Sequence, residues 1–232
     1  MARITRKELK SDKFALEVGQ TVSFFEEHRD QILRYGAIAL GVAVLVVGWT
    51  YYQKHQRAIR EEALATAITL QEASIGQPNV RGVNFPTQAA KDDVTTKTFS
   101  SLATKYAGTT EGEVARYYLG AIAADASKMP EAEKHFQEVA RRGNAEFASL
   151  AKLSLAQIYF GDGRDAQGEA ILRDLIRNPT TLVSKEQASI TLAHLLMVKR
   201  PAEARKLLDP LKTATGTVGR TVLSLYGQLP PQ

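Results

Sequence analysis

Residues 132–139 read AEKHFQEV, and this arrangement of one small and two large apolar residues returns twice at intervals of 36 residues. The corresponding segments are GEAILRDL at 168–175 and ARKLLDPL at 204–211. In each segment the apolar residues stand at positions i, i+4 and i+7, which line one side of an α-helix. Self-similarity at a fixed period of this length is typical of stacked helical hairpins. The pattern predicts an all-α solenoid.

A second helical pattern precedes each of these segments and repeats less strictly, through Leu119-Gly120, Leu155-Ala156 and Leu192-Ala193. Leu-Gly in a first helix and Ala-x3-Phe in a second resemble the tetratricopeptide repeat (TPR). The small residue lets paired helices approach closely, and the large one fills the gap toward the next repeat. The third unit slips by one residue in its first helix, and Pro210 should end its second helix early. We therefore expect an irregular, TPR-like array.

The regions around the three units also favour helix. Residues 53–74 are rich in Ala, Glu and Leu, and a further degenerate helix is expected around Phe99. Ser184 and Gln187 have the spacing of a capping box and predict a helix start. Residues 217–227 should form a terminal capping helix. Nothing from Thr87 onward has the period-two alternation of a strand.

Residues 35–52, YGAIALGVAVLVVGWTYY, contain no charged side chain. A helix of this length covers roughly 27 Å, close to the hydrocarbon core of a bilayer, about 30 Å thick. Tyr35 stands at one end and Trp49 and Tyr51 at the other, where amphipathic rings prefer the headgroup level. The segment predicts a single transmembrane helix that extends forward to Ile32.

Two alternatives to an uncleaved anchor are weaker. A cleaved secretory signal has a shorter apolar stretch and a small-residue cleavage site, whereas 34 residues precede this run and 48–51, GWTY, is a poor site. A buried core helix would be weakened by Gly36, Gly41 and Gly48, whereas glycine is common in membrane spans. We expect four parts: an N-terminal tail (1–31), a transmembrane helix (32–52), a linker helix and loop (53–86), and a TPR-like repeat domain (87–232).

The charges that flank the span leave its orientation open. The tail up to residue 34 carries seven Lys and Arg residues, against three just after the span, which favours a cytoplasmic N-terminus. Counting only the nearest twenty residues gives two before the span and three after it, which leans the other way.

Composition and spacing predict no catalytic, cofactor or metal site. The chain lacks cysteine, so disulfides and thiolate chemistry are excluded. Its net charge of +5 is too dispersed for the basic stripe of a nucleic-acid-binding protein. The four histidines have no metal-ligand spacing: His28, His55, His135 and His194. An enzyme with an unrecognised site is the rival interpretation from another class.

Two sets of residues are candidates for binding other proteins. Ala37, Gly41 and Gly48 share one side of the span, where small residues can pack a partner helix or a second copy, although glycine is common in spans for other reasons. Four aromatic residues of the repeats could line a concave binding surface, although at least half should belong to the core: Tyr117, Tyr118, Tyr159 and Phe160.

The region around the span carries a recognisable string. It comprises FFEEH at 24–28, Gly41, and GWTYYQKHQ at 48–56. Followed by an Ala-rich helix and degenerate repeats, it resembles the bacterial family of ancillary Sec translocon subunits, the YfgM-like proteins, whose repeat domain is grouped with that of the cell-division coordinator CpoB. The resemblance covers essentially the whole chain.

This resemblance implies a single-pass protein of the bacterial inner (cell) membrane, with a short cytoplasmic tail and a periplasmic repeat domain. Its implied partners are Sec translocon subunits and periplasmic chaperones. An envelope scaffold that coordinates cell division is the alternative within the same class. In either case the sequence predicts a membrane-bound protein scaffold.

Overall fold

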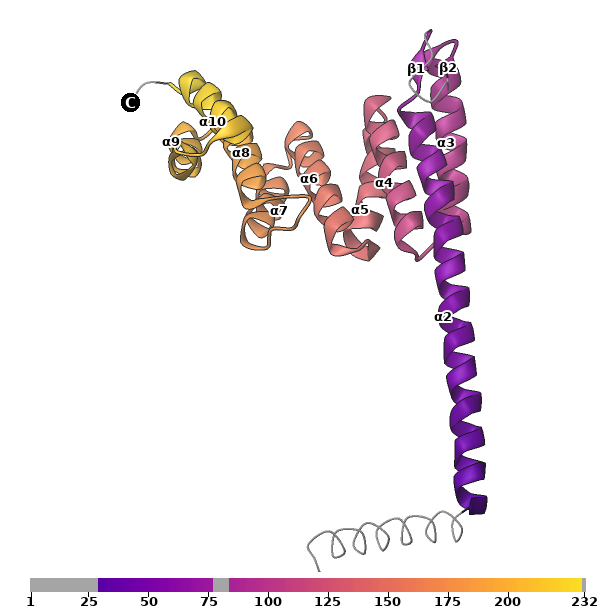
Figure 1. Ribbon diagram of the computed structural model, residues 1–232. Helices are drawn as coiled ribbons and strands as arrows, with labels where there is room; N and C mark the ends of the chain where they lie inside the picture. The colour runs from indigo at the N-terminus through magenta and orange to yellow at the C-terminus, as the bar shows by residue number, and fades with distance from the viewer. Residues whose placement is uncertain (1–28, 77–83, 231–232) are drawn as a thin grey trace, which may run out of the picture. The chain divides into compact units, whose positions relative to one another are not determined.

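The computed structural model describes residues 29–76 and 84–230, apart from the Ile32 side chain (Figure 1). These residues form nine α-helices: α2 (Arg29–Gln71), α3 (Gln88–Lys105), α4 (Thr110–Asp125), α5 (Met129–Arg142), α6 (Ala145–Gly161), α7 (Asp165–Arg177), α8 (Lys185–Leu196), α9 (Pro201–Leu208) and α10 (Gly216–Gln228). The predicted fold class is confirmed: an apolar N-terminal helix is followed by a solenoid of helical hairpins. The division into four parts stays a prediction, and most of the predicted tail lies outside the described residues.

The chain divides into two compact units, residues 1–59 and 60–232. The described part of the first unit consists of the N-terminal portion of α2. Its best 18-residue window has a mean hydropathy of 1.9, and none of the window is buried in the structure. This helix is therefore long and apolar enough to cross a membrane.

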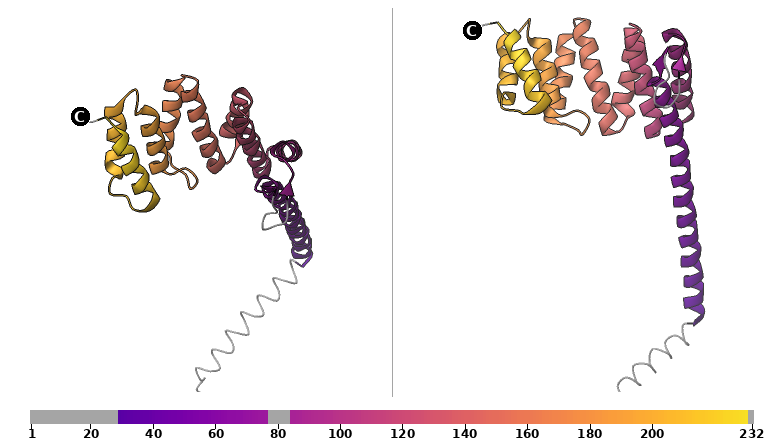
Figure 2. Two further views of the ribbon diagram at one scale, coloured as in Figure 1. Left: turned by 90° about the horizontal axis from the view of Figure 1, so that it is seen from above. Right: turned by 45° about the horizontal axis from the view of Figure 1, so that its top comes forward.

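The second unit is a row of helices in which each packs against its neighbours in sequence, as Figures 1 and 2 show for α3 to α9. Most of the buried apolar side chains in its described residues form three clusters along the row. The first joins Ala67 at the C-terminal part of α2 to Phe99 of α3 and Leu119 of α4. The other two lie between α4 and α7 and between α6 and α10. Such a core, shared between neighbouring hairpins, is what stabilises a solenoid.

The repeated positions occupy the core as the sequence predicted. The small residues Ala132, Gly168 and Ala204 are buried, as are the large residues four positions later, Phe136, Leu172 and Leu208. Close approach explains the small residues: a Cβ on Gly168 would lie 2.6 Å from Phe160 Cδ2, and one on Gly120 would lie 2.8 Å from Phe136 Cε1. Both distances are too short for a side chain without rearrangement.

Local signals set several helix ends. Ser184 is the N-cap of α8, and its hydroxyl accepts a hydrogen bond from the Gln187 backbone N–H at 3.1 Å. Asn144 caps α6 in the same way, accepting from the Phe147 N–H at 2.9 Å. Pro210 lies in a short 3-10 helix, η1 (Asp209–Leu211), that follows the end of α9 at Leu208, as predicted.

Two features of the connections were not predicted. The strands β1 (Ser74–Ile75) and β2 (Asn84–Phe85) pair in parallel within the segment expected to be a loop. The loop between α7 and α8 spans 178–184, whereas only residues 143–144 separate α5 from α6. Helix α8 therefore begins 40 residues after α6 rather than 36, which places the irregularity of the third unit at this connection.

Ion pairs between neighbouring repeats also recur at 36 residues. Arg164, in the turn before α7, pairs with Glu133 of α5 at 2.6 Å, and Arg200, in the turn before α9, pairs with Glu169 of α7. Arg205 stands where the next acidic residue would be, and its guanidinium lies over the Tyr226 ring of α10 at 5.0 Å. The 36-residue series of Arg–Glu ion pairs therefore ends where the last repeat meets α10.

These pairs predict an acid-sensitive stability. Hydrogen bonds from Arg164 and Arg200 hold the carboxyl pKa values of Glu133 and Glu169 below their ordinary value of 4.5. A lowered folded-state pKa stabilises the fold above 4.5, and this stabilisation is lost as the pH falls through the folded-state pKa. We expect Glu133→Gln/Glu169→Gln to lower the melting temperature at neutral pH and to reduce its fall in acid.

The measurement is the melting temperature of the full chain as a function of pH. Asp93→Asn is the control, because Asp93 belongs to an exposed i,i+4 pair within α3. An acid profile of the double variant that matches wild type would contradict the prediction.

Candidate protein-binding groove

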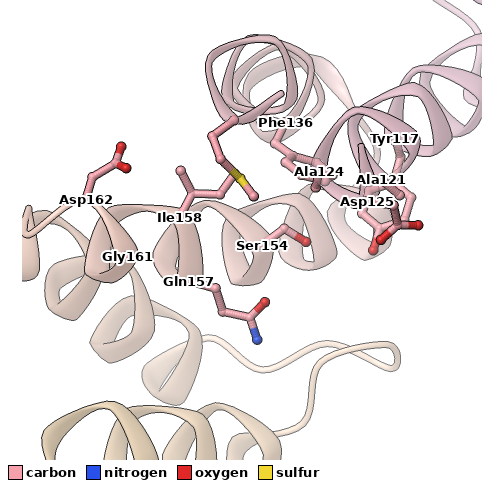
Figure 3. A pocket seen from close by; sticks show the side chains of 11 residues that line it. Tyr117, Ala121, Ala124, Asp125, Phe136, Ser154, Gln157, Ile158, Gly161 and Asp162 are labelled. Atoms are coloured by element: carbon pink, nitrogen blue, oxygen red, sulfur yellow. The ribbon is translucent and has the colours of Figure 1, made fainter. Parts of the chain in front are cut away.

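A cavity of about 540 Å³ opens between α4, α5 and α6 (Figure 3). It lies between the C-terminal halves of α4 and α6, with the first two turns of α5 on a third side. Its volume is within the range of roughly 300–1,000 Å³ found for ligand pockets in proteins. Helices α4 and α5 belong to one hairpin and α6 to the next, so the cavity results from the stacking of successive hairpins.

Apolar side chains make up most of its lining. They are Tyr117, Ala121, Ala124, Met129, Phe136 and Ile158. The Phe136 ring is 2% exposed, and its centroid lies 5.5 Å from that of Tyr117, so the two form an aromatic floor. Met129 is 38% exposed, and its flexible thioether can adapt to different bound groups.

Polar groups line the rest of the cavity: Asp125, Ser154, Gln157 and Asp162. The Ser154 hydroxyl donates to the Leu150 carbonyl oxygen at 3.2 Å, and Asp162 pairs with Arg164 at 2.6 Å. Asp125 and Gln157 are exposed. An apolar cavity bordered by a few polar groups suits an apolar side chain of a bound polypeptide whose backbone stays partly solvated.

A family model described as a tetratricopeptide repeat-like domain matches residues 23–176, about two thirds of the chain. The chain belongs to this family. The match includes the apolar part of α2, so the helix that could span a membrane and the repeats through α7 are parts of one family pattern. No curated protein matches the chain, and no solved structure matches it.

Of the four aromatic residues predicted to bind, one lines the cavity of this TPR-like domain. Tyr117 lies in its wall, and its ring also contacts Phe147 edge-on at 5.8 Å. Tyr118 does not line the cavity; its ring stacks on Phe99 with ring centroids 4.8 Å apart. Burial of its ring raises the pKa of the Tyr118 phenol. Tyr118 therefore packs between repeats.

The two aromatic residues of α6 also pack between repeats. Tyr159 is 9% exposed, lies under the Arg164 guanidinium at 4.2 Å, and accepts a hydrogen bond from Gln137 Nε2 at 3.2 Å. Phe160 is half-buried against Gly168. A binding role for any of the four aromatic residues stays a prediction.

The sequence did not single out Asp125, Met129 or Gln157, which line the cavity. The 36-residue period could have pointed to Gln157. This residue stands 36 positions after Ala121, and both residues line the cavity.

The predicted packing residues of the span, Ala37, Gly41 and Gly48, are all exposed on α2. Gly48 lines a shallow apolar depression together with Ala43, Val44 and Val47. Their packing against a partner helix or a second copy stays a prediction.

The part of the chain that the structure describes holds no group of three or more His, Asp or Glu side chains that could bind a metal ion. His135 of α5 is half-buried, and burial lowers the pKa of its imidazole. Arg116 also lowers this pKa, whereas Glu131 raises it. These are interactions within and between neighbouring helices, and TPR-like domains typically bind proteins without catalysis.

Proposed function

We propose that this chain is a membrane-anchored scaffold that binds other proteins through its TPR-like domain. The observation that carries the proposal is the open cavity of about 540 Å³ between successive repeats, in a chain whose apolar helix has no buried side chain in its most hydrophobic window. A fully exposed apolar segment of this length is unfavourable in water and is satisfied by lipid. The anchor concentrates the binding domain at a membrane surface.

The composition of the cavity supports a polypeptide as the bound partner. Its aromatic floor of Tyr117 and Phe136 can accept a bulky apolar side chain, and apolar anchors in preformed pockets supply most of the affinity of protein interfaces. The proposed role is non-catalytic: the domain holds a partner near the membrane.

The resemblance of residues 24–28 and 48–56 to YfgM-like proteins supports a more specific assignment. On this proposal the protein resides in the bacterial inner membrane, with its repeat domain in the periplasm. Its partners are Sec translocon subunits and the chaperones that receive newly exported polypeptides.

Photocrosslinking in native membranes tests this function. A photoreactive residue at Gln157, which lines the cavity, should capture Sec subunits or periplasmic chaperones. Gln167 provides a matched control, because it is also an exposed glutamine but lies on α7 and does not line the cavity. Capture from Gln157 and little from Gln167 is the expected result.

The identity of the captured proteins separates the alternatives. Wall-synthesis or cell-division proteins at Gln157 would favour the envelope coordinator. If Gln157 captured nothing beyond the background of Gln167, the cavity would not be a protein-binding site.

A further inference from the structure

A second cavity, of about 280 Å³, adjoins the first. It lies between the C-terminal ends of α2 and α4 and the first turns of α3, and its lining includes Gln71, Gln88, Asp92 and Ile122. Asp125, the last residue of α4, lines both cavities. We call the two cavities together the acidic groove.

The charge of this groove is opposite to that of the chain. The chain has a net charge of +5, yet among the residues that the structure describes the lining of the two cavities includes three aspartates, Asp92, Asp125 and Asp162, and no Lys, Arg or His. The described lining of the groove therefore presents negative charge beside apolar surface.

Within the described part of the chain, two of the three carboxylates lack a cationic partner. Asp162 is paired with Arg164 at 2.6 Å. Asp92 accepts a hydrogen bond from the neutral amide of Gln88 at 2.6 Å, and among the described side chains neither Asp92 nor Asp125 has a Lys, Arg or His nitrogen within ion-pair distance. Charge that is unpaired within the domain is available to a bound cation.

We propose that the acidic groove binds a cationic, amphipathic segment of a partner polypeptide. A bulky apolar side chain of the segment enters the larger cavity, between Tyr117, Met129 and Ile158. Lysine or arginine residues that flank it pair with Asp125 and with Asp92 in the smaller cavity. This inference rests on the proposed function and specifies the chemistry of the partner.

The physical roles of the two parts differ. The apolar cavity contributes affinity by removing a hydrophobic side chain from water. The carboxylates lie at exposed or half-buried positions, where charges mainly select the partner and speed its association. Binding should therefore weaken with rising salt, because ions screen exposed charges.

Two short fluorescent peptides test the proposal, with the full-length protein in a non-ionic detergent. One peptide has a central phenylalanine flanked by lysines, and the other has glutamate in place of each lysine. Fluorescence anisotropy should show that the lysine peptide binds at least about tenfold more tightly, and that its affinity falls as salt is added.

Charge reversal in the groove provides the decisive comparison. Asp92→Lys/Asp125→Lys should remove the preference for the lysine peptide or reverse it. Asp93→Lys is the matched control, since Asp93 is the next residue on α3, lines neither cavity, and pairs with Lys97 at 2.7 Å. If the reversed variant fails to fold, as judged by its circular dichroism, Asp92→Asn/Asp125→Asn should weaken binding of the lysine peptide alone.

Equal affinity for the two peptides, or a preference that survives the changes at both aspartates, would overturn the inference. Failure of the inference can be told from failure of the proposed function by the crosslinking from Gln157. Partners captured there with no dependence on peptide charge would leave the scaffold function intact and remove only the cationic specificity.

Discussion

Truncation of Phe136 to alanine is expected to lower the free energy of unfolding by about 3–5 kcal/mol. The side chain is 2% exposed and lies so close to Gly120 of α4 that a Cβ at that position would be 2.8 Å from the ring. Its ring also forms the floor of the larger cavity with Tyr117. The loss combines the transfer of an aromatic ring to water with a void that rigid neighbouring helices cannot close.

Thermal unfolding of the full chain, followed by circular dichroism, measures this effect. For a domain of this size we expect a melting temperature lower by roughly 10 °C. Leu223→Ala is the control: Leu223 is 60% exposed on α10, so its truncation should leave the melting temperature nearly unchanged. If Phe136→Ala had the melting temperature of wild type, Phe136 would not contribute to the stability of the core.

The solenoid could be predicted because its core repeats in the sequence. Each hairpin buries the same small and large positions against the next, so the chemical requirement at Ala132 recurs at Gly168 and Ala204. Proline and cap residues act locally, which is why the early end of α9 and the cap at Ser184 were also predictable. These features need only the residue and its near neighbours in the chain.

The cavity was harder to predict because it depends on three helices at once. The sequence predicted aromatic residues at the binding surface. Tyr118 and Tyr159 instead pack between repeats, where a large ring buries the most surface. Met129 and Gln157 gave no local signal and acquire a role only from the relative placement of α5 and α6. The parallel pairing of β1 with β2 was not predictable either, because a strand of two residues is too short to show an alternating pattern.

Introducing arginine at Val44 is expected to cost at least roughly 2.5 kcal/mol of membrane insertion. Val44 lies at the middle of the uncharged run 35–52, where a guanidinium is furthest from either interface, and its side chain is 63% exposed, so no protein group shelters it. In water, the same change at an exposed position would be nearly neutral. The expected cost therefore comes from the lipid alone.

Alkaline carbonate extraction of membranes that carry the full chain measures this effect. Wild type and Val44→Ala should remain in the pellet, and a substantial share of Val44→Arg should move to the supernatant. Leu223→Arg is the matched control, because Leu223 is 60% exposed and also apolar but lies in the repeat domain; its fractionation should equal wild type. Unchanged extraction of Val44→Arg would show that the apolar part of α2 is not held by the bilayer. A membrane-free wild-type protein that has lost residues 35–52 would identify the segment as a cleaved signal, and the anchor would have to be abandoned.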